Sequence, residues 1–143
     1  MENNTADRNS QISNGINKNT SYKAPPLRNL PIIQKLISAY KLWQEFLTHF
    51  PKTSRSLGFK IDNLFLEITE LFFIAGYLNK EQKTRYLNRA SIKFDLLKFF
   101  MQMSWEIKIL DNKKYIVLSE KLSEIGKMLG GWKKSIENKT SAI

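Results

Sequence analysis

The sequence contains no cysteine, a single histidine and no long apolar run. Without cysteine the chain cannot form disulfides, thiolate metal sites or a cysteine nucleophile. The one histidine, His49, has no second histidine and no orienting acid in an obvious motif, so nucleophilic catalysis has no support. The lack of disulfides is compatible with a cytoplasmic protein, and this is the location we expect.

No apolar stretch approaches the roughly 18 residues that a transmembrane helix requires. The first thirty residues are rich in Asn, Ser and Thr and lack the apolar segment of a secretory signal. We therefore expect no membrane partner. Residues 1–29 are typical of a disordered polar leader, closed by the proline pair Pro25-Pro26.

Beyond the leader, apolar residues recur at the three- and four-residue spacing of helices. Pro51 and two short polar turns interrupt this pattern. The helices that the pattern predicts run over about 31–50, 57–78, 80–109 and 115–136. Short connections between four helices predict an all-α protein, an up-down-up-down four-helix bundle over residues 30–136. We expect residues 137–143 to form a frayed tail.

The charge is strongly positive and unevenly spread. The net charge is +10, from 23 Lys and Arg against 13 Asp and Glu. Segments 80–110 and 112–136 each carry a net charge of +4, whereas segment 57–79 carries −2. Such a balance favours polyanion partners, because each neutralised phosphate releases condensed counterions. A merely soluble, lysine-rich surface is the alternative.

One basic ridge stands out on the third predicted helix. Arg85, Arg89 and Lys93 are spaced i, i+4 and i+8, so they share one face. Guanidinium groups grip phosphate oxygens in pairs, which favours sequence-independent phosphate contact. Pairing with carboxylates of the second predicted helix is the alternative. The candidate nucleic-acid-binding residues are Arg85, Arg89, Lys93, Lys127, Lys133 and Lys134, followed by Lys52 and Arg55.

The third predicted helix also carries a second apolar band, largely opposite its core face. A helix that is apolar on both sides cannot bury both within a small monomer. A wide core stripe is one explanation; burial against another copy or a partner protein is the one we favour, so we expect self-association. The band consists of Ile92, Leu96, Phe99, Phe100, Met103 and Ile107, and Phe59, Leu66, Phe73 and Tyr77 of the second helix add to it.

A glycine pair precedes a tryptophan near the C-terminus. Because Gly-Gly is a poor helix interior, Gly130 or Gly131 is expected to supply a helix end at positive φ or a close-packing position. Simple helix termination is the other interpretation, and it is the one that we favour for the two glycines. Trp132 is expected to cover the end of the bundle core or to lie in an interface between subunits. Lys133 and Lys134 then lie beside this end, within reach of phosphate or of the helix's negative pole.

Two segments resemble the accessory variability determinant (Avd) proteins of diversity-generating retroelements. They are FPKTSR at residues 50–55 and LSEIGKMLGGWKK at residues 122–134, and the resemblance spans residues 30–136. It implies a four-helix bundle that forms a homopentameric barrel with a basic, RNA- and DNA-binding surface. It also implies binding to the retroelement reverse transcriptase, its template-repeat RNA and the RNA–cDNA. Such proteins support the error-prone cDNA synthesis of mutagenic retrohoming without being the polymerase.

Other chemistries of helical proteins need residues that this chain lacks. A di-metal carboxylate site needs Glu-x-x-His pairs, but Glu67 and Glu70 have only His49, on another helix. A magnesium-dependent nucleotide pyrophosphatase needs further acids gathered around the same glutamates, and the remaining acids are scattered. Helical RNases with an arginine five residues before a histidine are excluded by Gln44. We therefore expect no enzyme, no metal and no cofactor.

Two alternatives stay open at this point. One is a ribosomal-RNA-associated four-helix protein without a polymerase partner. The other is an oligomeric structural adaptor whose charge is incidental. A neighbouring reverse-transcriptase gene separates the first from an Avd protein, and salt-sensitive RNA binding separates the second.

Overall fold

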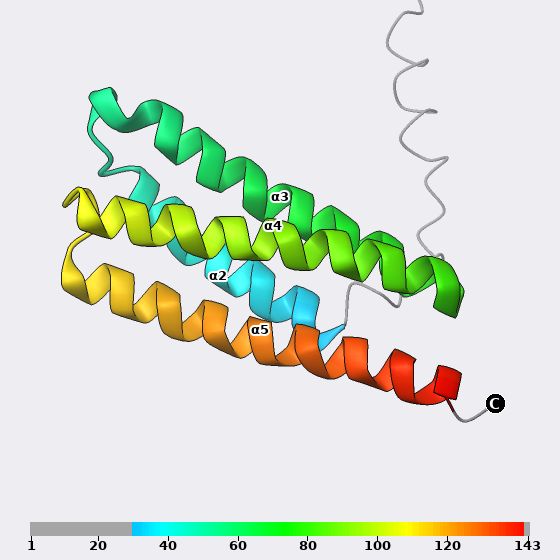
Figure 1. Cartoon of the computed structure of the whole chain (residues 1–143). Coiled ribbons are helices and arrows are strands. Elements are labelled where there is room, and N and C mark those ends of the chain that lie inside the picture. The colour runs from blue at the N-terminus through cyan, green and yellow to red at the C-terminus, as the bar shows by residue number, and fades with distance from the viewer. Residues whose placement is uncertain (1–29, 142–143) are drawn as a thin grey trace, which may run out of the picture.

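The computed structural model describes residues 30–141, and this range is helical apart from its connections (Figure 1). Its elements are α2 (Pro31–Leu47), the short 3-10 helix η2 (Lys52–Ser54), α3 (Arg55–Tyr77), α4 (Lys80–Glu106) and α5 (Asn112–Ser141). No strand occurs between residues 30 and 141, so the predicted all-α class is confirmed there. The predicted leader over residues 1–29 lies outside the described residues, as do residues 142–143.

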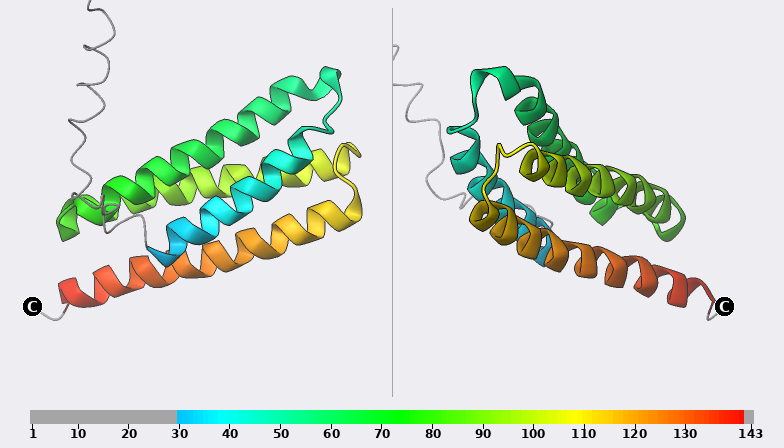
Figure 2. Two further views of the ribbon diagram at one scale, coloured as in Figure 1. Left: turned by 180° about the vertical axis from the view of Figure 1, so that it is seen from behind. Right: turned by 60° about the vertical axis from the view of Figure 1, so that its left-hand side comes forward.

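The four long helices form an antiparallel bundle. α3 packs along both α2 and α4, and α5 packs along both α4 and α2. The chain reverses direction from each helix to the next, which gives the expected up-down-up-down order (Figures 1 and 2). The α2–α3 connection and the α4–α5 turn therefore lie at the same end. Within residues 30–141, no helix combines the length and the apolar character that spanning a bilayer requires.

An apolar stripe from each helix fills the core. Trp43 is fully buried, with Phe50 edge-on at 5.1 Å and Phe65 stacked at 6.3 Å between ring centroids. The other fully buried residues come from all four helices: Leu36, Ala39, Ile61, Leu64, Ile68, Phe72, Ala75, Leu87, Ala90, Leu97, Leu118 and Ile125. Burial of this apolar surface is the main force that holds the helices together.

A polar contact joins α2 to α3 beside this core. Gln44 donates a side-chain hydrogen bond to the Asp62 carboxylate. The pKa of the Tyr40 phenol is raised, mainly by burial and next by the hydrogen bond with Asp62. The contact satisfies polar groups that are partly withdrawn from water.

α2 ends earlier than predicted, at Leu47 instead of residue 50. The N–H groups of His49 and Phe50 still donate to the carbonyls of Phe46 and Leu47, at 3.1 and 3.0 Å. These bonds reach back three residues instead of four, so the last turn is tighter than an α-helix. The helix ends here because Pro51 disfavours a helical conformation at the residue before it. The bounds of α3 differ from the prediction by at most two residues.

α4 also ends earlier than predicted, at Glu106, because the backbone takes a left-handed conformation at Lys108, with φ of 65°. The N–H groups of Ile109 and Leu110 then donate to the carbonyl of Ser104, at 2.9 and 3.1 Å. This pattern closes a helix end by satisfying its last carbonyls. Ser104 is buried, whereas the next residue, Trp105, is 38% exposed.

The prediction that Gly130 or Gly131 supplies a helix end or a close-packing position is wrong. α5 continues through both residues to Ser141, and neither glycine has a positive φ. A Cβ at either position would meet no neighbouring atom within 4 Å. The helix continues because the next turns bury Ile136 against the core, which offsets the cost of helical glycine, about 1 kcal/mol each. It also extends into residues 137–141, where we expected a frayed tail.

The open space at Gly131 makes the continuous helix testable. Gly131→Ala should raise the free energy of unfolding by about 0.5–1 kcal/mol, because alanine loses less backbone entropy in a helix. Gly58→Ala is the matched control and should gain less, because its Cβ would lie 2.7 Å from Leu47 Cδ1 and that side chain must move. Urea unfolding followed by circular dichroism measures both. A destabilised Gly131→Ala variant would contradict a helix that runs through the glycine pair.

Candidate nucleic-acid interface

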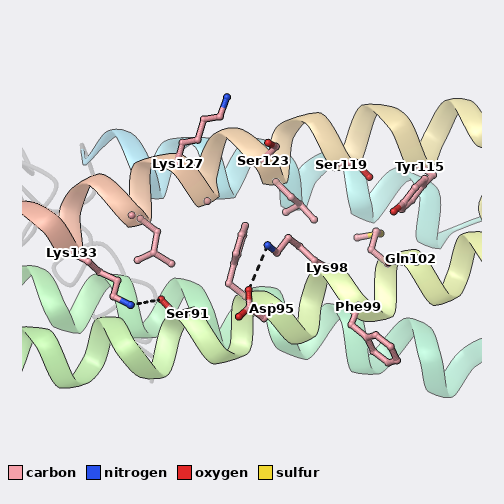
Figure 3. Close-up of a pocket in the computed structure, with 16 residues that line it drawn as sticks. Ser91, Asp95, Lys98, Phe99, Gln102, Tyr115, Ser119, Ser123, Lys127 and Lys133 are labelled. Atoms are coloured by element: carbon pink, nitrogen blue, oxygen red, sulfur yellow. Dashed lines mark hydrogen bonds and ion pairs between the residues drawn. The ribbon is translucent and has the colours of Figure 1, made fainter.

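A groove of about 930 Å³ runs between α4 and α5 (Figure 3). Its polar lining recurs every three or four residues, so it occupies the flank of each helix next to the buried stripe. α4 contributes Ser91, Asp95, Lys98 and Gln102, and α5 contributes Tyr115, Ser119, Ser123, Lys127 and Lys133. The groove is therefore built where the two most basic segments of the chain meet.

Positive charge exceeds negative charge in this groove. Lys133 reaches across it, with Nζ 3.4 Å from the Ser91 hydroxyl (Figure 3). Lys98 Nζ lies 3.5 Å from Asp95 Oδ1, an exposed contact that stabilises little. Lys127 is exposed, extends from α5 away from α4 (Figure 3), and forms no ion pair with the side chains that the structure describes. Three amines against one carboxylate suit an anionic ligand.

The predicted ridge does not line the groove. Lys93 Nζ lies 3.1 Å from Glu67 Oε2 of α3, so the carboxylate pairing considered as an alternative does occur at this residue. The Arg89 guanidinium lies 5.4 Å from the centre of the Tyr86 ring. Arg85 and Arg89 are exposed and form no ion pair within the described part of the chain. The predicted cations therefore do not form one continuous site.

The remaining candidates lie elsewhere on the bundle. Lys52 and Arg55 are exposed at the α2–α3 connection, and Lys134 is exposed on α5 outside the groove lining. Of the predicted cations, the groove brings together only Lys127 and Lys133. Both come from the C-terminal segment that carries the family resemblance.

The family model described as bAvd-like matches residues 31–136, from the first residue of α2 to the last part of α5. The chain belongs to the bAvd-like family. This confirms the family predicted from the two sequence segments. A search of curated proteins gives no match. The bAvd-like match includes every residue that lines the groove, and the family is one of accessory proteins that is not known as catalytic.

The bAvd-like protein also exposes apolar side chains on the outer sides of α3 and α4. Ile92 is 63% exposed and Phe99 is 58% exposed, so the band on α4 is not part of a wide core stripe. We call this surface the outer band. It consists of Phe59, Leu66, Phe73 and Tyr77 on α3 and Ile92, Leu96, Phe99 and Met103 on α4. Side chains of this kind are costly to leave in water.

Three residues predicted for the interface lie outside the outer band. Phe100 is half-buried and packs against the core. Ile107 is exposed but lies just beyond the end of α4. Trp132 is half-buried, with its ring 6.1 Å from that of Phe72, so within one chain it packs against the core.

Sequence reasoning missed Lys98 and the hydroxyl and amide groups of the groove. Lys98 lies one turn after Phe94, which marks it as a residue on the flank of the core stripe. Lys98 is part of a groove because α5 packs on that flank, and the sequence does not say which helix packs there. Amines and hydroxyls at this spacing can bind several oxyanions in a row. Residues 30–141 hold no cluster of three acidic or histidine side chains placed for a metal ion.

Proposed function

We propose that this bAvd-like protein is a non-catalytic accessory factor that acts in the cytoplasm. It binds a retroelement reverse transcriptase together with its template-repeat RNA and RNA–cDNA, and so supports mutagenic cDNA synthesis. The observation that carries this proposal is the family match over residues 31–136, combined with the basic groove inside it. The family supplies the accessory role, and the groove supplies a surface for RNA.

The distribution of charge supports RNA binding at the α4–α5 side of the bundle. Segments 80–110 and 112–136 carry +4 each, and the fold packs them side by side, while α3 carries −1, from Arg55 and Lys60 against Asp62, Glu67 and Glu70. Phosphate contacts with lysine release counterions from the nucleic acid, which drives association without reading the sequence. An accessory factor needs this kind of contact, because it must hold different stretches of template.

The outer band supports self-association. It places eight large apolar side chains in water on one chain, more than isolated surface residues require. Packing against other copies would bury them, and the pentamer we expect follows from the resemblance to Avd proteins. An oligomer repeats the groove around its circumference, so a long RNA gains affinity from several weak contacts.

The groove cations give the first test of this function. Lys127→Glu combined with Lys133→Glu should weaken binding to single-stranded RNA at least tenfold, because two lysines that line the groove are replaced by carboxylates that repel phosphate. The slope of log K against log salt concentration should become shallower by about 1.4, the value for two lost phosphate contacts on a single strand. Fluorescence anisotropy over a salt series measures both quantities.

Two control variants locate the effect. Lys41→Glu with Lys60→Glu makes the same change of net charge at exposed positions of α2 and α3, outside the groove. It should weaken RNA binding much less. Equal losses in both variants would contradict a groove site and favour an incidental charge. Arg85→Glu with Arg89→Glu tests the ridge separately, and unchanged RNA affinity and cDNA synthesis would remove it from the RNA path.

The outer band predicts a change of oligomeric state. Ile92→Glu with Met103→Glu should convert the native oligomer to monomers, because carboxylates cannot be buried in an apolar interface. Both side chains are exposed in the single chain and neither lines the groove, so fold and groove should be retained. Light scattering after size-exclusion chromatography measures the mass. An unchanged mass would show that another surface holds the copies together.

A further inference from the structure

The groove between α4 and α5 has a strip of small residues along its α5 wall, between larger side chains such as Tyr115 and Lys133. On α5, successive turns line it with Ser119, Ser123, Gly126 and Gly130. None of these residues extends beyond a hydroxyl, so the groove reaches down to the backbone of the helix. A ligand can therefore approach α5 more closely than it can approach most helices.

The two glycines of this wall have different surroundings. A Cβ at Gly126 would lie 3.2 Å from Cε1 of Phe94, so glycine is needed there for the packing of α5 on α4. A Cβ at Gly130 would meet no neighbouring atom within 4 Å, and its φ is not positive. Neither packing nor backbone conformation requires glycine at 130. Because Gly130 lines the groove and lacks a side chain, it leaves the backbone of α5 open to the close approach of another molecule there.

We infer that the groove takes a single nucleic-acid strand and excludes a duplex, and that Gly130 is where the strand comes closest to α5. This inference rests on the proposed function. The axes of packed helices lie about 8–10 Å apart, so the surface groove along such a pair is narrower than a nucleic-acid duplex. A duplex carries its phosphates on the outside of a much wider cylinder and touches only the rims of such a groove.

The lysines of the groove are available to bind a strand that enters it. The contact of Lys133 with Ser91 is long, at 3.4 Å, and that of Lys98 with Asp95 is 3.5 Å and exposed. Both are weak, so phosphate oxygens replace them at little cost. Lysines from both walls can then neutralise the strand, which is the pattern of grooves that follow a single-stranded backbone.

An aromatic pair lies where the groove meets the α4–α5 turn. Tyr115 lines the groove, and its ring stacks on Trp105 at 5.0 Å with an interplanar angle of 13°. Trp105 is also held by a hydrogen bond from its indole N–H to Asn112 Oδ1 at 2.7 Å, yet it stays 38% exposed. A fixed, partly exposed aromatic surface suits an unpaired base, whose faces a duplex keeps stacked inside.

The neighbouring glycines provide a matched pair of variants. Gly130→Leu fills the groove, whereas Gly131→Leu makes the same change at a position with the same open space outside the groove lining. Neither changes the net charge, and thermal unfolding checks that both fold. With labelled oligouridine as the probe, Gly130→Leu should lower affinity about tenfold, and Gly131→Leu should leave it within about twofold. Native protein should bind a blunt RNA duplex of equal length much more weakly than oligouridine.

The results separate this inference from the function on which it rests. Unchanged oligouridine binding in Gly130→Leu, with binding still lost in the Lys127→Glu and Lys133→Glu variant, would overturn the single-strand groove and leave RNA binding intact. Duplex binding as tight as oligouridine binding would also overturn it. No binding of any RNA by the native protein would overturn both. A selective loss in Gly130→Leu, with Gly131→Leu unaffected, would support the inference.

Discussion

The arrangement of α4 and α5 depends on the packing of the Phe94 ring against the bare backbone of Gly126. Phe94 is almost fully buried, and a Cβ on residue 126 would come within 3.2 Å of its ring. The residues one turn further along each helix, Lys98 on α4 and Gly130 on α5, flank this contact and line the groove. A core contact thus fixes the distance between two groups of residues that we assign to binding. Core packing and the RNA binding that we propose share one helix pair, so a change at Phe94 should affect both.

α4 has a different role on each of its sides. One side supplies the core, one side faces α5 across the groove, and the outer side carries apolar residues such as Ile92. Toward α3, Lys93 pairs with Glu67. Phe99 belongs to the outer band and also lines the groove, so an interface formed by the outer band would border the groove. Under the function that we propose, each added copy would extend the path available to the nucleic acid.

The sequence predicted most of the fold, because helical spacing and proline breaks are local signals that burial reinforces. It failed where tertiary packing overrides local preference. Gly130 and Gly131 have poor helix propensity, yet α5 continues through them because Ile136 is buried beyond. The site was less predictable than the fold. Charge spacing alone singled out Lys93, which α3 neutralises, and missed Lys98, whose role depends on the helix packed beside it. Local spacing indicates which face of its helix a residue occupies, whereas only the folded bundle shows which other helix packs against that face.

The central claim is that this bAvd-like protein joins a reverse transcriptase to its RNA. The most direct measurement is co-expression with the reverse transcriptase encoded nearest to it, followed by co-purification over a salt series and sequencing of the bound RNA. We predict a complex that contains both proteins and template-repeat RNA, with the RNA released as salt rises. Absence of the polymerase, together with salt-sensitive binding of ribosomal RNA by this chain alone, would contradict the claim and identify a ribosomal-RNA-associated protein instead.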